Sequence, residues 1–395
     1  MRRPSRRVLP TVIGVGVLTS LAVNGALVAS WRQAPDETPV RAGAQRYVAA
    51  SSGSYVSPTA VAPLGDRATP HLMAAATGSL PSDVVERVRG LKGVDRVEVM
   101  DAAQAMVGNK RVGLLGVDPS TFRAFTPKPT AQSDDLWRNI AGGDIAISFT
   151  MGNDGGVRLG TQIPVGGQQR QSRMRVGAYA TMGLGDVDAV ISRTAARSLG
   201  VPAGNAVLIS AESKTDRKKL AKALRKLLPK GTKTVEVNPE IDVPAPGGSL
   251  PKARGQVMNA LQVQTVIRAA HTRLGWPYVW GGESESEGGY DCSGLMQYAF
   301  ARAGIKLPRV AADQARAGWV LPYSKARPGD MLIWANDPTA PGYISHIALY
   351  LGEGKMLAAP RRGTVVQVQD VYTNNMKGAV RVNPQMGARL ADSGL

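Results

Sequence analysis

The chain of 395 residues contains a single cysteine, and its surroundings favour a nucleophile. Cys292 follows Asp291 and opens the segment 292–304 (CSGLMQYAFARAG), in which apolar residues recur at helical spacing. We therefore expect a helix that begins at Cys292 and ends at Gly304. Unpaired N–H groups and the positive end of the helix dipole favour the thiolate, the reactive form of cysteine. A lone cysteine is more often a buried small side chain, but the glycine-rich approach and a later histidine favour chemistry here.

Hydrolysis of an amide by a cysteine also requires a base and hydrogen-bond donors for the oxyanion. His346 opens the alternating segment 346–351 (HIALYL), which predicts a strand, and it is the base that we expect to act with Cys292. His71 and His271 are interpreted as structural residues. The backbone amides of Cys292 and Ser293, together with Tyr278, are candidates for the oxyanion site. The chain has no CxxC spacing, so we expect neither a metal nor another cofactor.

Four motifs place this region in a family by resemblance. They are YVWGG (278–282), YDCSG (290–294), RPGD (327–330) and SHIALYLGEGKM (345–356). In this order they resemble the signatures of the NlpC/p60 cysteine peptidases, which cleave peptide bonds in the stem peptides of bacterial peptidoglycan. The resemblance implies a papain-like domain, with the cysteine on an N-terminal helix and the histidine on an antiparallel sheet.

The same resemblance implies roles for residues beside the nucleophile. Tyr278, Asp291 and Ser293 match positions that hold the stem peptide, with Asp291 pairing with a free amine. Asp291 can equally be the N-cap of the helix that follows it. The loop 283–287 (ESESE) adds three carboxylates, which either attract ammonium groups of the substrate or form a solvated acidic loop.

The third position of the expected triad departs from the family pattern. NlpC/p60 peptidases usually carry His, Asn, Gln or Glu twelve positions after the base and before an Ala-Pro pair. This chain has Ala358, followed by Ala359-Pro360, and alanine cannot accept a hydrogen bond from the imidazole. Losing the third member of a serine triad costs about 10⁴-fold in kcat, but a thiol needs less activation than a hydroxyl.

Three functions therefore remain open from the sequence. The first is a cell-wall endopeptidase that acts through a Cys292 acyl-enzyme, with reduced activity. The second is a catalytically impaired peptidoglycan-binding scaffold of an envelope complex. The third is a thiol acyltransferase on the same fold.

The region 70–240 predicts a second α+β domain without chemistry of its own. Strands are expected at 142–151, 157–165, 173–182 and 186–192, beside helices at 83–91 and 215–229. The order of these elements, with a VxxVxV strand and the turn motif LLGVDP, resembles the periplasmic core domain of MacB-type ABC-transporter permeases. On this resemblance we expect a spacer or a docking module for an envelope protein partner. Its acidic residues are interpreted as turn residues: Asp118, Asp144, Asp154, Asp186 and Asp188.

The N-terminus predicts export. A basic tail (1–7) precedes the uncharged segment 8–30, which is long enough for a transmembrane helix and longer than the apolar core of a signal peptide. We expect a single-pass anchor in the cell membrane with the body outside the cytoplasm, although Val28-Ala29-Ser30 also allows cleavage and secretion. Linkers are expected at 31–69 and 241–256, and the peptidase domain at 257–395.

The charge of the chain restricts its partners. The formal net charge of +18 indicates acidic partners, such as anionic lipid or wall polymers. No zinc finger, basic zipper or ribonucleoprotein motif is present, so no nucleic-acid partner is expected. The expected partners are peptidoglycan peptides, the cytoplasmic membrane and an envelope protein.

Overall fold

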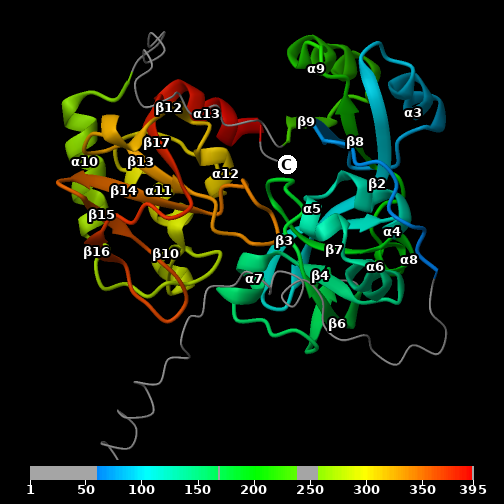
Figure 1. Ribbon diagram of the computed structural model, residues 1–395, viewed down its shortest axis with the longest axis horizontal. Helices are drawn as coiled ribbons and strands as arrows, with labels where there is room; N and C mark the ends of the chain where they lie inside the picture. The colour runs from blue at the N-terminus through cyan, green and yellow to red at the C-terminus, as the bar shows by residue number, and fades with distance from the viewer. Residues whose placement is uncertain (1–59, 168–169, 238–256, 394–395) are drawn as a thin grey trace, which may run out of the picture. The chain divides into compact units, whose positions relative to one another are not determined.

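The computed structural model describes residues 60–167, 170–237 and 257–393, all of which belong to one compact unit of the chain, 44–395 (Figure 1). The described residues form a mixed α/β structure with one large sheet in 60–237, called here the middle region, and another in 257–393, called here the C-terminal domain. Within these ranges no helix combines the length and apolarity needed to cross a bilayer. The predicted transmembrane segment 8–30 lies outside the described residues.

The middle region contains a nine-stranded sheet in the order β3-β7-β4-β6-β5-β2-β8-β1-β9. Strand β2 also pairs with β3, so six strands close into a ring, and β8, β1 and β9 extend from it. The strands are β1 (Leu72–Ala75), β2 (Val94–Val107), β3 (Lys110–Val117), β4 (Ile145–Ile147), β5 (Gln162–Gly166), β6 (Gln171–Tyr179), β7 (Val187–Ser192), β8 (Ala206–Ala211) and β9 (Lys233–Glu236). The helices are α3 (Ser82–Arg89), α4 (Pro119–Phe122), α5 (Lys128–Ala131), α6 (Asp134–Ala141), α7 (Phe149–Asn153), α8 (Arg193–Ser198) and α9 (Arg217–Leu227).

The predicted strands of the middle region are present, but two of them are much shorter than expected. In the segment 157–165 the strand β5 begins only at Gln162. The segment 142–151 was expected to be a single strand, but only Ile145–Ile147 is extended, and Phe149–Asn153 is the helix α7. The cause is Ser148, which is the N-cap of α7 and whose hydroxyl accepts a hydrogen bond from the Met151 amide at 3.2 Å. The resemblance of this region to the MacB-type domain stays a prediction.

The C-terminal domain is built on a six-stranded antiparallel sheet in the order β12-β17-β13-β14-β15-β16. Its strands are β12 (Gly318–Leu321), β13 (Met331–Trp334), β14 (His346–Gly352), β15 (Lys355–Ala358), β16 (Gln367–Asp370) and β17 (Met376–Val382), with the separate pair β10 (Glu283–Ser284) and β11 (Gly289–Tyr290). The helices are α10 (Ala260–His271), α11 (Cys292–Ala301), α12 (Ala311–Gln314) and α13 (Pro384–Ser393). This is the predicted arrangement of a cysteine helix beside an antiparallel sheet whose strand begins at the histidine.

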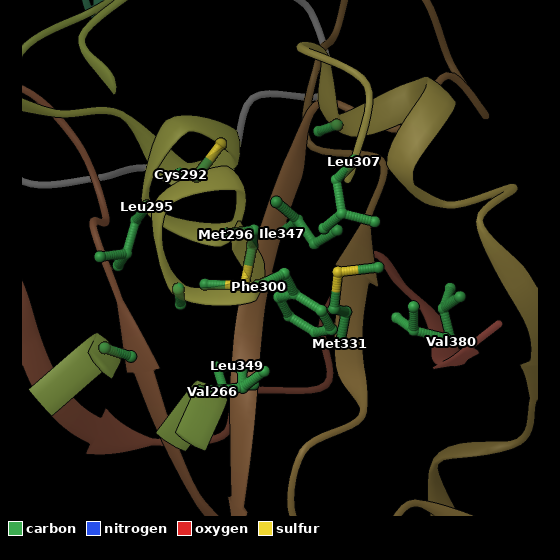
Figure 2. Close-up of a cluster of buried hydrophobic side chains, with 14 of the residues drawn as sticks. Val266, Cys292, Leu295, Met296, Phe300, Leu307, Met331, Ile347, Leu349 and Val380 are labelled. Carbon is green, nitrogen blue, oxygen red and sulfur yellow. The ribbon is translucent and has the colours of Figure 1, made fainter. Parts of the chain in front are cut away.

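Helix α11 is held against β14 by its apolar face. Met296 and Phe300 are fully buried and belong to the same core cluster as Ile347 and Leu349 of β14. Figure 2 shows Cys292 on the first turn of the helix, at the end of this cluster away from Leu349. Full burial of a side chain such as Leu, Met or Phe contributes about 1.5–3 kcal/mol, so the cluster fixes the position of the cysteine relative to the sheet.

The spacing of apolar residues predicts a helix over 257–274 that buries a stripe including Leu261, Val266, Ala270 and Leu274, but α10 is shorter and buries this stripe only in part. Val266 and Ala270 are fully buried, whereas Leu261 is 68% exposed and Leu274 is 43% exposed. The expectation that both leucines face the core is wrong. Leu261 lies in the first turn and Leu274 lies beyond the last residue of the helix, so neither faces the core.

Candidate active site

Cys292 is the first residue of α11, as predicted, because Asp291 caps the helix. The Asp291 side chain accepts a hydrogen bond from the Gly294 amide at 2.7 Å, and the Asp291 carbonyl accepts one from the Leu295 amide at 3.0 Å. The first bond satisfies one of the donors that a helix N-terminus leaves unpaired, and the second is the first hydrogen bond within the helix. The cap therefore sets where the helix begins and places the thiol on its first turn.

His346 is the first residue of β14 and lies opposite Trp334 of β13 in the antiparallel register. Cys292 and His346 both line a cleft of about 370 Å³. The predicted site residues Tyr278, Asp291 and Ser293 line the same cleft. The fold thus brings together, on one cleft, five of the six site residues that the sequence analysis singled out.

Ala358, the sixth, is the last residue of β15 and is fully buried. It belongs to an apolar cluster with Trp334, Ala348 and Met356. Its methyl group offers no hydrogen bond to His346, as expected from the sequence. The site is therefore a cysteine and a histidine without a polar side chain at the third position.

Burial decides the charge state of both reactive groups. Burial, with the nearby charge of Asp291, raises the pKa of Cys292 to about 12. Burial lowers the pKa of His346 to about 4. Each side chain is 8% exposed, so at neutral pH the site holds a thiol and a neutral imidazole. The expectation that the helix N-terminus makes Cys292 a thiolate is wrong for this conformation, because desolvation of the sulfur outweighs the helix dipole.

Arg309 is a functional-site residue that the sequence reasoning missed. Its guanidinium binds both carboxylate oxygens of Asp291, at 3.1 Å and 2.7 Å, and donates to Ser293 Oγ at 2.9 Å. Ser293 Oγ in turn donates to Asp291 at 3.2 Å, and the Gly281 amide donates to Asp291 at 2.9 Å. Asp291 is therefore already paired with a cation, and the expected free-amine site is occupied by Arg309.

The acidic loop also has cationic and backbone partners. Glu285 pairs with Arg273, and Glu283 pairs with Arg309 at 3.2 Å. Glu287 accepts hydrogen bonds from the Glu283 amide at 2.8 Å and from a serine hydroxyl. All three glutamates are exposed, which agrees with the solvated-loop interpretation of the sequence.

The middle region supplies part of the cleft wall. Lys110, Asp154, Asp186 and Asp188 line the same cleft as Cys292. Burial raises the pKa of Asp154 and of Asp186 to about 6, and it also raises the pKa of Asp188. The interpretation of these three aspartates as turn residues was incomplete, since nothing in the local sequence indicates that they face the cysteine.

The other two aspartates of the middle region have local roles. Asp118 caps α4 by accepting a hydrogen bond from the Ser120 amide at 2.9 Å, and Asp144 pairs with Arg175. These contacts agree with their interpretation as structural residues.

Polar contacts join the middle region to the loop before β14. Thr181 donates its amide to Thr339 Oγ1 at 3.0 Å and its hydroxyl to Asp337. Thr130 donates to the Thr339 carbonyl at 3.2 Å, and Tyr343 donates to the Gly185 carbonyl at 3.4 Å. Thr339 and Asp337 are buried, so these hydrogen bonds fix the loop that leads into His346 against the middle region.

The C-terminal domain has known relatives. Residues 275–382 match the model of the NlpC/P60 family, so this part of the chain is an NlpC/P60 domain. The peptidoglycan endopeptidase RipA of Mycolicibacterium smegmatis is 39% identical over 145 residues, which cover 34% of this chain and 28% of that protein. RipB of Mycobacterium tuberculosis is 38% identical over 154 residues, covering 34% and 62%.

A further relative and a solved structure of RipB also match the chain. The gamma-D-glutamyl-L-lysine dipeptidyl-peptidase of Bacillus subtilis is 40% identical over 105 residues, covering 27% of this chain and 34% of that protein. The solved structure of the peptidoglycan hydrolase RipB matches with a TM-score of 0.28 and 38% identity, over 31% of this chain and 64% of that one. The chain thus spans less than two thirds of each of these relatives.

Proposed function

We propose that the protein is a cell-wall hydrolase that cleaves peptide bonds in the stem peptides of peptidoglycan. The observation that carries the proposal is the position of the two reactive groups. The NlpC/P60 domain has the single cysteine of the chain at the start of α11 and His346 at the start of β14, on one cleft. The names of the relatives, which are peptidoglycan endopeptidases, support the substrate class.

The neutral state of both groups defines how the reaction begins. With a thiol pKa of about 12 and an imidazole pKa of about 4, a stable ion pair does not form before substrate binds. His346 therefore acts as a general base that takes the thiol proton while the sulfur attacks the scissile carbonyl. The same proton then passes to the leaving amine, and water hydrolyses the acyl-enzyme.

The groups that surround the sulfur have defined tasks in this proposal. The amides of Cys292 and Ser293 and the Tyr278 hydroxyl stabilise the oxyanion, because the two later first-turn amides are already bonded to Asp291. Burial keeps the pKa of Tyr278 well above its ordinary value, so its hydroxyl stays a donor. Tyr278, Asp291 and Ser293 hold the stem peptide, with Asp291 exchanging Arg309 for the substrate's amine.

The test is a cleavage assay on purified disaccharide-peptides, read by mass spectrometry. We expect new amine termini with the wild-type protein and none with Cys292→Ala or His346→Gln. The variant His271→Gln is the matched control, since His271 is exposed on α10 and should leave the products unchanged. A larger ligated product would indicate an acyltransferase instead.

A second candidate function is a scaffold that binds wall peptides without cutting them. Ala358 and the uncharged dyad favour it, because both reduce the activation of the nucleophile. Sedimentation with insoluble peptidoglycan tests this function. Equal retention of wild type and Cys292→Ala, with no cleavage by either, would support the scaffold and exclude the hydrolase.

We also propose that the segment 8–30 anchors the protein in the cell membrane and that the body lies outside the cytoplasm, where the middle region docks an envelope protein. The uncharged length of the segment and the basic tail before it support this location. Alkaline extraction of membranes and the mass of the mature N-terminus test it. Release into the medium with an N-terminus near Trp31 would indicate a cleaved signal instead.

A further inference from the structure

The missing third residue leaves open what orients the imidazole of His346. Trp334 lies opposite His346 in the β13–β14 register, and Leu332 lies opposite Ala348. Because side chains alternate between the two faces of a sheet, His346, Ala348 and Trp334 project from the same face. Ala358 belongs to the apolar cluster on that face.

The indole of Trp334 packs beside the imidazole. The two ring centroids lie 5.5 Å apart, and the ring planes are tilted by 47°. Trp334 and Ala358 are both fully buried in the same cluster. A larger side chain at position 358 would compete with the indole for this space, since a packed interior has few voids.

Trp334 is itself held by Tyr372. The two rings are stacked, with centroids 4.8 Å apart and planes inclined by 29°, and Trp334 Nε1 donates to the Tyr372 carbonyl at 3.0 Å. Asn336 donates from Nδ2 to Tyr372 Oη at 3.3 Å and from its amide to Ser345 Oγ at 2.9 Å. The Ser345 amide donates to the Trp334 carbonyl at 3.0 Å. Ser345, which precedes His346, is therefore hydrogen-bonded to both Trp334 and Asn336.

We propose that Trp334, backed by Tyr372, is the positioning residue of His346 and replaces the polar third residue of the triad. The proposal rests on the proposed function. The tilted indole packed beside the imidazole limits the rotamers of His346 by steric contact, without a hydrogen bond. Misplacement of a reacting group by about 1 Å can cost about 10²-fold in rate, so loss of this packing should lower kcat strongly.

The experiment compares changes at Tyr372, which is 37% exposed and can be replaced without opening the core. Tyr372→Leu removes the stack on Trp334, whereas Tyr372→Phe keeps it, and both variants keep the backbone carbonyl that accepts from the indole. Tyr323→Leu is the matched control, because Tyr323 packs on the same cluster through its ring pair with Tyr350.

We expect Tyr372→Leu to lower kcat on wall peptides by about 10-fold to 100-fold with KM within about twofold. Tyr372→Phe and Tyr323→Leu should stay within about twofold of wild type. Equal kcat values for Tyr372→Leu and Tyr323→Leu would overturn the proposal, because the stack of Tyr372 on Trp334 would then have no effect on the position of His346.

A second measurement keeps the proposal separate from the proposed function. The chain has three histidines, so the ring protons of His346 can be followed by NMR in isotope-labelled protein without substrate. We expect ring protons of His346 shifted by the Trp334 indole in wild type and Tyr372→Phe, and averaged ring-proton shifts in Tyr372→Leu. If wild type cleaves nothing, the proposed function fails, and unchanged shifts in Tyr372→Leu would still refute the positioning role.

Discussion

Acidification should destabilise the protein through His346. Its pKa in the folded protein is about 4, below the ordinary value of about 6.5, because the ring is buried. The unfolded chain therefore takes up a proton first as the pH falls. The stability contributed by the neutral ring is complete above pH 6.5 and is lost between pH 6.5 and pH 4.

The size of this loss follows from the two pKa values. Each pH unit between them changes the free energy of unfolding by about 1.4 kcal/mol. At pH 4.5 the protonated unfolded state is favoured by about 2–3 kcal/mol relative to pH 7.5 through this one residue. Such a loss is a large part of the 5–15 kcal/mol that usually stabilises a domain.

The assay is urea denaturation at pH 7.5 and pH 4.5, followed by circular dichroism. Other groups titrate in this range, including Asp154 and Asp186, so the informative quantity is the difference between wild type and His346→Gln. We expect the variant to lose about 2–3 kcal/mol less than wild type on acidification, and His271→Gln to behave as wild type. Equal losses in wild type and His346→Gln would refute the reasoning, since the imidazole would then not be sealed from water.

Three further predictions concern the same site. Iodoacetamide should alkylate folded Cys292 about 10³-fold more slowly at pH 7.5 than the urea-unfolded chain, because a thiol pKa of about 12 leaves little thiolate; rates within tenfold of each other would contradict this. Arg309→Met should lower the free energy of unfolding by about 2–3 kcal/mol and Arg309→Lys by less, since Asp291 loses a paired cation in a largely buried site; urea curves that coincide with wild type would exclude a structural role for the pair. Ala358→Glu should destabilise the protein by at least about 2 kcal/mol and give no faster cleavage, because the carboxylate has no room beside Trp334; a faster enzyme with an unchanged melting temperature would show that the triad can be restored.

The elements that carry the reactive groups were predictable because their signals are local. Asp291 is a good N-cap, and the apolar spacing after Cys292 matches one face of a helix. The pattern after His346 matches a strand, which buries Ile347 and Leu349 on one face and Ala348 on the other. The boundary at Ser148 was missed, because a short apolar run is compatible with either a strand or a helix.

The contacts that determine the charge and orientation of the site were not predictable. Arg309 meets Asp291 from a loop that no periodicity connects to the helix. The protonation of Cys292 depends on how deeply the folded chain buries its sulfur. The residues next to the cysteine in the sequence do not reveal that depth. Tyr372 reaches Trp334 from the segment between β16 and β17, so only the pairing of distant strands reveals the stack.

The closeness of Trp334 to His346 gives the protein an internal optical signal. A protonated imidazole accepts an electron from an excited indole and quenches its emission, whereas a neutral imidazole does so weakly. With the two rings 5.5 Å apart, the emission of Trp334 should follow the charge on His346 in a variant whose five other tryptophans are replaced. If His346 takes the thiol proton, as proposed, stopped-flow fluorescence of that variant would time this step.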